Sequence, residues 1–345
     1  MISMSIQGLF LLRIALALAP VLLFLIALRA LDSYKLVSVR AVFMALGAGA
    51  LAAMLCYLLN TFVFRRFPGY EDQYTLFGAP VVEELAKASY WIFLIGTARV
   101  AFMADSAICG FAVGAGFAVV ENIAYLHLLE GRGIGIWVLR GFGTAVMHGG
   151  VAAIGAALSV FLLEERESTG LRLFVPGLVA AVLLHSLFNQ SLESPVASTV
   201  AAIMGLPVIL AIIFYFSEKE LRNWLGGKLD RDIDMIGMIG SKEFRETPVG
   251  TYLMTLQEAF PPAVRGDMLS LLQLISELSA RTKSELMLRE IGLEVEPDPE
   301  LESLLTELGY LEKSIGPTGM MAIRPLLSQT PRDLWEMHRL GQKLH

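Results

Sequence analysis

The chain has 345 residues, of which 55% are hydrophobic and 17% charged, and its mean hydropathy is +0.61. Such values lie outside the range of soluble globular domains and inside that of membrane proteins. Residues 1–216 carry twelve basic and twelve acidic side chains, so the net charge of −6 comes entirely from residues 217–345. This acidic C-terminal third argues against nucleic acid as a partner, because nucleic-acid binding needs a basic surface.

Seven apolar segments of the chain are long enough to cross a bilayer as helices, which takes about 20 largely apolar residues. The first has no basic segment before it and no small-residue cleavage site after it, so we expect a membrane span there rather than a cleaved signal. The predicted fold is therefore all-α, a polytopic transmembrane helix bundle. The spans are expected at roughly 8–30, 41–63, 75–98, 103–126, 134–163, 171–190 and 195–216.

The distribution of basic residues predicts how the bundle is oriented. Lys and Arg are more frequent in the first, third and fifth loops and after the last span than in the alternate loops. Because basic loops favour the cytoplasmic side, we expect the N-terminus outside and the C-terminal region in the cytoplasm.

From residue 218 onward the sequence is typical of a soluble, mainly helical domain. Leu269, Leu272, Ile275 and Leu278 recur at helical spacing, as in the core face of a helix. We therefore expect two domains, a transmembrane domain over residues 1–217 and a cytoplasmic helical domain over residues 218–345. The second domain offers a surface for a homodimer or for a regulatory partner.

Four of the predicted spans contain ionisable residues, which is costly in a bilayer. A charged side chain at the centre of a spanning helix costs roughly 2.5–3.5 kcal/mol even on the lenient insertion scale. Ionisable residues inside a membrane are therefore candidates for a functional site. The polar residues of spans three to six that we single out are Glu83, Glu84, Lys87, Glu121, Asn122, His148, His185 and Asn189.

Helical spacing indicates how these residues could cooperate. Side chains three or four positions apart share a face, so Lys87 can neutralise Glu83 or Glu84 and leave the other as a base. His185 and Asn189 share a face in the same way. At ~1.5 Å per residue, all four groups fall between the middle and the outer half of the bilayer. We expect one polar cluster that is open toward the outside.

The residue types in this cluster favour hydrolysis. A carboxylate can take a proton from water while a second group stabilises the oxyanion. Glu121, His148 and His185 could also hold a zinc ion, which typically takes three protein ligands and a water in a catalytic site. The sequence contains no HExxH motif. The residues alone leave a zinc-dependent and a metal-free glutamic mechanism equally open.

At these residues the sequence resembles the PrsW family of intramembrane proteases, which is related to the CAAX prenyl endopeptidases. The resemblance covers about residues 75–190. It rests on four motifs in order: Glu83-Glu84-x-x-Lys87, F-x-x-x-E-N at Phe117 to Asn122, His148 in the next span, and H-x-x-F-N at His185 to Asn189. Each motif is weak alone, and the order makes the set specific.

The resemblance implies an intramembrane endopeptidase of the inner membrane of a bacterial-type cell. Its implied substrate is a single-span membrane protein, an anti-sigma factor cut on its extracytoplasmic side. The candidate catalytic residues are Glu83 or Glu84 as the base, Lys87 tuning that pair, His148 and His185 holding a metal or the oxyanion, Glu121 as ligand or second acid, and Asn189 as oxyanion donor.

Other interpretations of the same residues compete with this one. Each polar group could be a buried ion pair or an interhelical contact that only holds spans together. The chain could also be a proton- or ion-coupled transporter, although it lacks the inverted repeats typical of that class. A third alternative is a non-catalytic signalling scaffold. Outside the cluster, we expect Arg140 to extend its side chain to the membrane interface.

Overall fold

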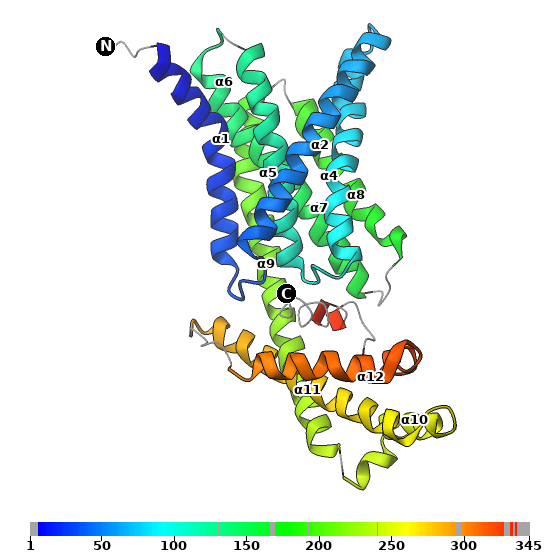
Figure 1. Cartoon of the computed structure of the whole chain (residues 1–345). Coiled ribbons are helices and arrows are strands. Elements are labelled where there is room, and N and C mark those ends of the chain that lie inside the picture. Colours follow the sequence, from blue (N-terminus) through cyan, green and yellow to red (C-terminus); the bar gives the residue numbers. More distant parts are fainter. Residues whose placement is uncertain are drawn as a thin grey trace. The chain divides into compact units, whose positions relative to one another are not determined.

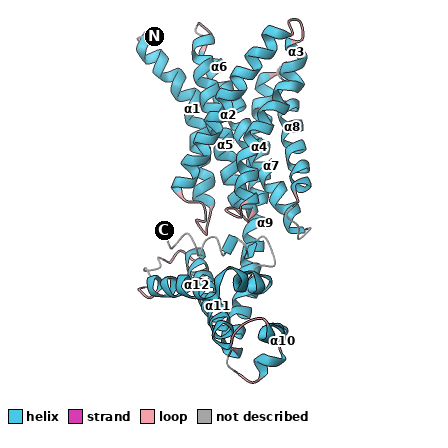
Figure 2. Cartoon of the chain, turned by 45° about the vertical axis from the view of Figure 1, so that its right-hand side comes forward, coloured by secondary structure: helices cyan, strands magenta, loops and turns pink. Residues whose placement is uncertain are grey.

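A computed structural model describes residues 6–129, 131–165, 170–191, 194–239, 241–293, 299–327, 332–333 and 335–336. These residues form helices and loops and include no strand, which confirms the all-α prediction (Figure 2). The chain divides into two compact units, Met1–Glu218 and Lys219–His345. Helix α9 (Pro195–Met238) begins in the first unit and continues into the second.

Unit 1 is a bundle of long helices (Figure 1). Among the described residues, six helical segments are long and apolar enough to cross a membrane, and α4 is not one of them. Helix α4 and the π-helical turn η1 occupy the third expected span, and the 18 residues of α4 include Glu83, Glu84 and Lys87. The elements of unit 1 before α9 are α1 (Ile6–Leu31), α2 (Val39–Arg66), α3 (Glu71–Gln73), η1 (Tyr74–Gly78), α4 (Ala79–Gly96), α5 (Met103–Leu128), α6 (Ile134–Val138), the π-helical turn η2 (Leu139–Ala145), α7 (Val146–Glu165), the 3-10 turn η3 (Leu171–Phe174) and α8 (Val175–Gln190).

Helix α5 forms the centre of unit 1, where it packs against α1, α2, α4 and α7. Two of its glycines allow the neighbouring backbones to come very close. A Cβ atom on Gly116 would lie 2.0 Å from the carbonyl oxygen of Leu46 in α2, and one on Gly114 would lie 2.1 Å from that of His148 in α7. The small residues therefore bring the backbone that carries His148 directly against α5.

The antiparallel order of the helices gathers the candidate residues at one end of unit 1. The C-terminal halves of α2, α5 and α8 meet the starts of α4 and α7 there. The opposite end holds the loops that follow α1 and α4. At that end the hydroxyl of Ser33 donates to Glu218, and the backbone N–H of Ala104 donates to Ser217.

Unit 2 has its own helical core. Apolar side chains of α11 and α12 pack together, among them Leu271, Leu308 and Ile323. Of the four residues predicted for a core face, Ile275 and Leu278 belong to this core, Leu272 is buried outside it and Leu269 is only partly buried. Helix α12 is kinked at Gly316, which has a φ of 72°. The described elements after α9 are η5 (Glu243–Glu246), α10 (Pro248–Thr255), η6 (Leu256–Glu258), α11 (Pro262–Glu290) and α12 (Leu301–Leu327).

Candidate active site

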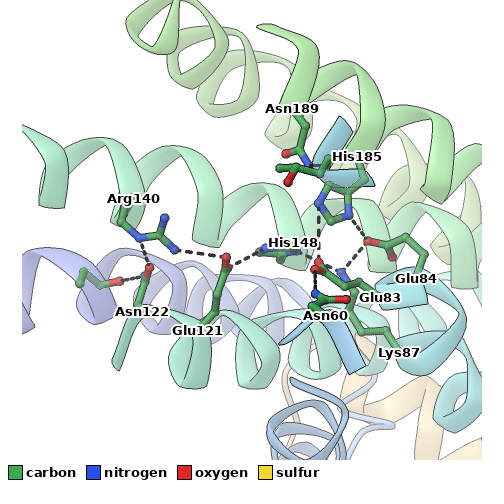
Figure 3. A network of polar contacts seen from close by, with 12 residues as sticks. Asn60, Glu83, Glu84, Lys87, Glu121, Asn122, Arg140, His148, His185 and Asn189 are labelled. Carbon is green, nitrogen blue, oxygen red and sulfur yellow. Dashed lines mark hydrogen bonds and ion pairs between the residues drawn. The ribbon is translucent and has the colours of Figure 1, made fainter. Parts of the chain in front are cut away.

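The polar residues of the spans form a continuous chain of contacts (Figure 3). In order, the chain runs through Asn122, Arg140, Glu121, His148, Lys87, Glu84, His185, Glu83 and Asn60. These residues come from α2, α4, α5, η2, α7 and α8, so the fold brings together residues that are far apart in the sequence.

Glu84 and Lys87 lie at the buried centre of this chain. The Lys87 ammonium donates to Oε1 of Glu84 at 2.5 Å, and both side chains are almost fully buried. The same Glu84 oxygen lies 2.7 Å from Nδ1 of His185. An ionised carboxylate can only accept hydrogen bonds, so Nδ1 of His185 carries the proton and its Nε2 keeps a lone pair.

His148 is held in a comparable way by a second carboxylate. Its Nε2 lies 3.0 Å from Oε2 of Glu121, and its Nδ1 lies 3.1 Å from the ammonium of Lys87. Lys87 can only donate, so Nδ1 of His148 is the acceptor and Nε2–H donates to Glu121. Each histidine therefore has one nitrogen bound to a carboxylate, which fixes its tautomer and ring orientation.

Glu83 is placed differently from Glu84, although the two are adjacent. Successive residues of a helix point about 100° apart, so the Glu83 side chain reaches the wall of a cavity while Glu84 is buried. Its Oε1 accepts a hydrogen bond from Nδ2 of Asn60 at 3.3 Å, and its Oε2 lies 3.8 Å from Nε2 of His185. The second distance is too long for a direct hydrogen bond.

Arg140 belongs to the site, and the prediction that it reaches the membrane interface is wrong. Its guanidinium donates to Oδ1 of Asn122 at 2.8 Å, lies 3.3 Å from Glu121 and stacks 3.7 Å above the ring centroid of Tyr125. Asn122 in turn donates to the carbonyl of Ala17. The guanidinium of Arg140 is therefore held inside the bundle by these contacts.

Asn189 lies at the rim of the cluster. Its Nδ2 donates to the carbonyl oxygen of Thr75 in η1 at 3.0 Å, which joins α8 to that turn. The side chain also lines the cavity. An Asn amide has two N–H donors, so this contact leaves one donor for a substrate.

A cavity of about 690 Å³ opens beside the cluster. Glu83, Glu121, Arg140, His148 and His185 supply its polar wall. Its apolar wall includes Met54, Leu58, Phe117, Leu128 and Phe188. The volume is within the usual range of ligand sites, and the mixed lining suits a peptide segment with apolar side chains.

The residues of the cluster fit a divalent metal ion. Among the described residues, one ligand atom each from Glu83, His148 and His185 lies within 4.8 Å of the others. Two imidazoles and one carboxylate form a donor set that zinc hydrolases use. Each imidazole is also backed by a carboxylate on its other nitrogen, as metal-bound histidines usually are. The expected set contained Glu121, whereas the group in the structure contains Glu83, and Glu121 contacts Nε2 of His148.

The formal charges of the cluster also favour a cation. Its three glutamates, Glu83, Glu84 and Glu121, face two permanent cations, Lys87 and Arg140. With all three carboxylates ionised and both histidines neutral, the formal charge of the cluster would be −1. Lys87 already places its ammonium at Nδ1 of His148, so a metal ion at that nitrogen would replace this contact.

One comparison with known proteins identifies a family. The family model described as PrsW family intramembrane metalloprotease matches residues 37–216, more than half of the chain. The matched range contains every residue of the polar chain, from Asn60 to His185, and Asn189 as well. No curated protein and no solved structure matches the chain.

Proposed function

The chain belongs to the PrsW family of intramembrane metalloproteases, and on this premise we propose that it cleaves membrane-anchored proteins at the cluster of Glu83, His148 and His185. Membership makes it an integral membrane hydrolase and favours proteolysis over the transporter and scaffold interpretations. One observation carries the assignment of the site. The ligand atoms of these three residues converge within 4.8 Å, and all three side chains line the cavity.

Glu83 is the residue we assign to water activation. Of the three glutamates, Glu84 is buried against Lys87, and both oxygens of Glu121 have cationic or imidazole partners. Oε2 of Glu83 and Nε2 of His185 are two acceptors 3.8 Å apart. A water shared by them can donate one hydrogen to each, which directs its oxygen lone pairs toward a substrate carbonyl. In a site without an ion, Glu83 then takes the proton as that oxygen attacks.

Two further groups suit the charge that develops on the substrate. The second N–H of Asn189 is available at the cavity wall for the oxyanion. The Lys87 ammonium lies 3.1 Å from Nδ1 of His148, where its positive charge favours a negative charge in the cavity. Glu84 and Glu121 act on the two histidines by holding their orientation.

A divalent ion would be held by Glu83, His148 and His185. When bound, such an ion supplies Lewis-acid activation of water and of the scissile carbonyl.

We further propose that the substrate is a single-span membrane protein, such as the anti-sigma factor that the family resemblance implies. A cavity of about 690 Å³ holds a few side chains rather than a folded domain, so the substrate would enter as an unwound segment. The distribution of basic residues supports a cytoplasmic C-terminal domain and cleavage on the outer side of a bacterial-type inner membrane. Residues 218–345 would then contact a second copy or a regulatory partner in the cytoplasm.

Elemental analysis of the purified protein tests the metal site. We expect about one zinc ion per chain in the wild type, and its loss in His185→Ala and Glu83→Ala, because each change removes a ligand. Glu121→Ala should retain most of the metal while binding it more weakly, since Glu121 orients His148 and is not in the ligand group. Wild-type protein without stoichiometric metal would contradict the metal site and leave Glu83 to act with a metal-free water.

A further inference from the structure

Two uncharged residues, Tyr74 and Asn60, link the π-helical turn η1 to Glu83. The hydroxyl of Tyr74 donates to Oδ1 of Asn60 at 2.7 Å, and Nδ2 of Asn60 donates to Oε1 of Glu83 at 3.3 Å. Asn60 lies beside Glu83 in Figure 3. The three residues come from η1, α2 and α4, so this path connects three separate elements.

The tyrosine determines which end of the asparagine amide faces Glu83. The two ends of an amide have nearly the same shape, so hydrogen-bond partners decide the orientation. With Tyr74 donating to Oδ1, the NH₂ group points to Glu83. The reversed amide would place its carbonyl against the Glu83 carboxylate, and two acceptors would then face each other.

The position of the Tyr74 ring depends on Gly78. A Cβ atom on Gly78 would lie 2.4 Å from Cδ2 and 2.8 Å from Cε2 of that ring. The Tyr74 ring also contacts Phe64 of α2, whose ring meets it edge-on at 5.5 Å between centroids. The ring therefore contacts both α2 and Gly78, and a side chain on Gly78 would displace it.

We propose that Tyr74 and Asn60 are positioning residues for Glu83. By binding Oε1 of Glu83 on the α2 side, Asn60 leaves Oε2 directed toward His185, where the shared water or ion would bind. Tyr74 acts only through Asn60, and Gly78 acts only through Tyr74. This inference rests on the proposed function of Glu83 and adds two residues that act through Glu83, of which Asn60 also lines the cavity.

The test uses the full-length protein in liposomes with a single-span reporter protein that the wild type cleaves. Tyr74→Phe should lower kcat about 10-fold and Asn60→Leu 10- to 100-fold, with KM little changed, because partners of this kind typically contribute such factors. The double variant should be no slower than Asn60→Leu alone, since Tyr74 acts through Asn60. Gly78→Ala should match Tyr74→Phe.

A second readout does not depend on cleavage. Zinc titrated into metal-stripped protein should bind 10- to 100-fold more weakly to Asn60→Leu and about 10-fold more weakly to Tyr74→Phe. Tyr70→Phe and Gly96→Ala are matched controls, because the Tyr70 side chain is exposed and a Cβ on Gly96 would meet no atom within 4 Å. Both controls should behave as wild type.

The outcomes separate this inference from the proposed function. If the wild type cleaves and binds zinc, and both Asn60→Leu and Tyr74→Phe match it in kcat and zinc affinity, only the positioning role is overturned. Additive losses in the double variant would also overturn it, because Tyr74 would then act independently of Asn60. A wild type that neither cleaves nor binds zinc overturns the proposed function together with this inference.

Discussion

At the scale of single residues, the adjacent acids Glu83 and Glu84 have different surroundings. Glu84 is buried between Lys87 and His185, whereas Glu83 reaches the cavity and contacts Asn60. The difference follows from the helix, which turns by about 100° between neighbours. The Glu-Glu-x-x-Lys pattern thus combines one acid that can face a substrate with one that holds Lys87 and His185 in position.

This division predicts how Lys87 contributes to stability. Lys87→Met leaves the Glu84 carboxylate buried without its cation, so we expect the free energy of unfolding to fall by about 3–5 kcal/mol. Adding Glu84→Gln should recover most of the lost free energy of unfolding, because it removes the unpaired charge. Thermal denaturation in detergent measures both effects.

The same pair of variants separates stability from catalysis. The double variant Glu84→Gln/Lys87→Met should be nearly as stable as wild type and still cleave poorly, since His185 has lost its carboxylate. Full cleavage by this double variant would show that Glu84 and Lys87 only hold the helices together.

The sequence predicted the charged part of the site better than the uncharged part. Glu83, Lys87 and His148 stood out because such residues are costly in an apolar span, and the structure brings them together. Asn60 and Tyr74 gave no such signal, since Asn and Tyr are common near the end of a span and cost little free energy there. Arg140 gave the same signal as these charged residues, because it lies inside the expected span 134–163.

At the scale of elements, two π-helical turns precede the helices that carry the site. Turn η1 leads into α4 with Glu83, and η2 leads into α7 with His148. Such turns frequently occur at functional sites. Hydrophobic patterning predicted the segments 75–98 and 134–163 as spans, but it could not predict a local change of helical pitch, which depends on packing.

The glycines of α5 provide an element-scale prediction. Gly114→Ala would place a Cβ atom 2.1 Å from the carbonyl oxygen of His148, so α5 and α7 must separate. We expect a loss of about 1–3 kcal/mol in the free energy of unfolding and slower cleavage, because His148 moves away from His185. Thermal denaturation and a cleavage assay measure the two effects.

The matched control is Gly47→Ala in α2, where a Cβ would meet no atom within 4 Å. It should preserve both stability and cleavage. Equal behaviour of the Gly114 and Gly47 variants would mean that the close approach of α5 and α7 is not needed for the site.

At the scale of the whole molecule, hydropathy predicts where a span ends but not where the helix that contains it ends. Hydropathy predicted the last span to end at 216, whereas α9 continues to Met238. Apolarity ends where the membrane would end, but no residue there stops a helix, so the helix itself continues. The charged residues of α4 explain why that element lies outside the six most apolar segments.

The predicted orientation of the molecule can be tested directly. We expect residues 219–345 on the cytoplasmic side, because basic residues follow the last span. A protease added to intact spheroplasts should leave this unit uncut and should digest it once the membrane is permeabilised. Digestion in intact spheroplasts would reverse the assigned orientation and place the cavity end of the bundle on the cytoplasmic side.

Glu83 is the residue on which the proposed hydrolysis depends, because it activates the water. The most direct measurement is cleavage of a single-span reporter by purified protein in liposomes, comparing wild type with Glu83→Gln. Gln keeps the shape of Glu but cannot take a proton, so we predict that kcat falls by about 10²–10⁴ while thermal stability is preserved. Cleavage by Glu83→Gln at the wild-type rate would contradict the assignment of Glu83 to water activation.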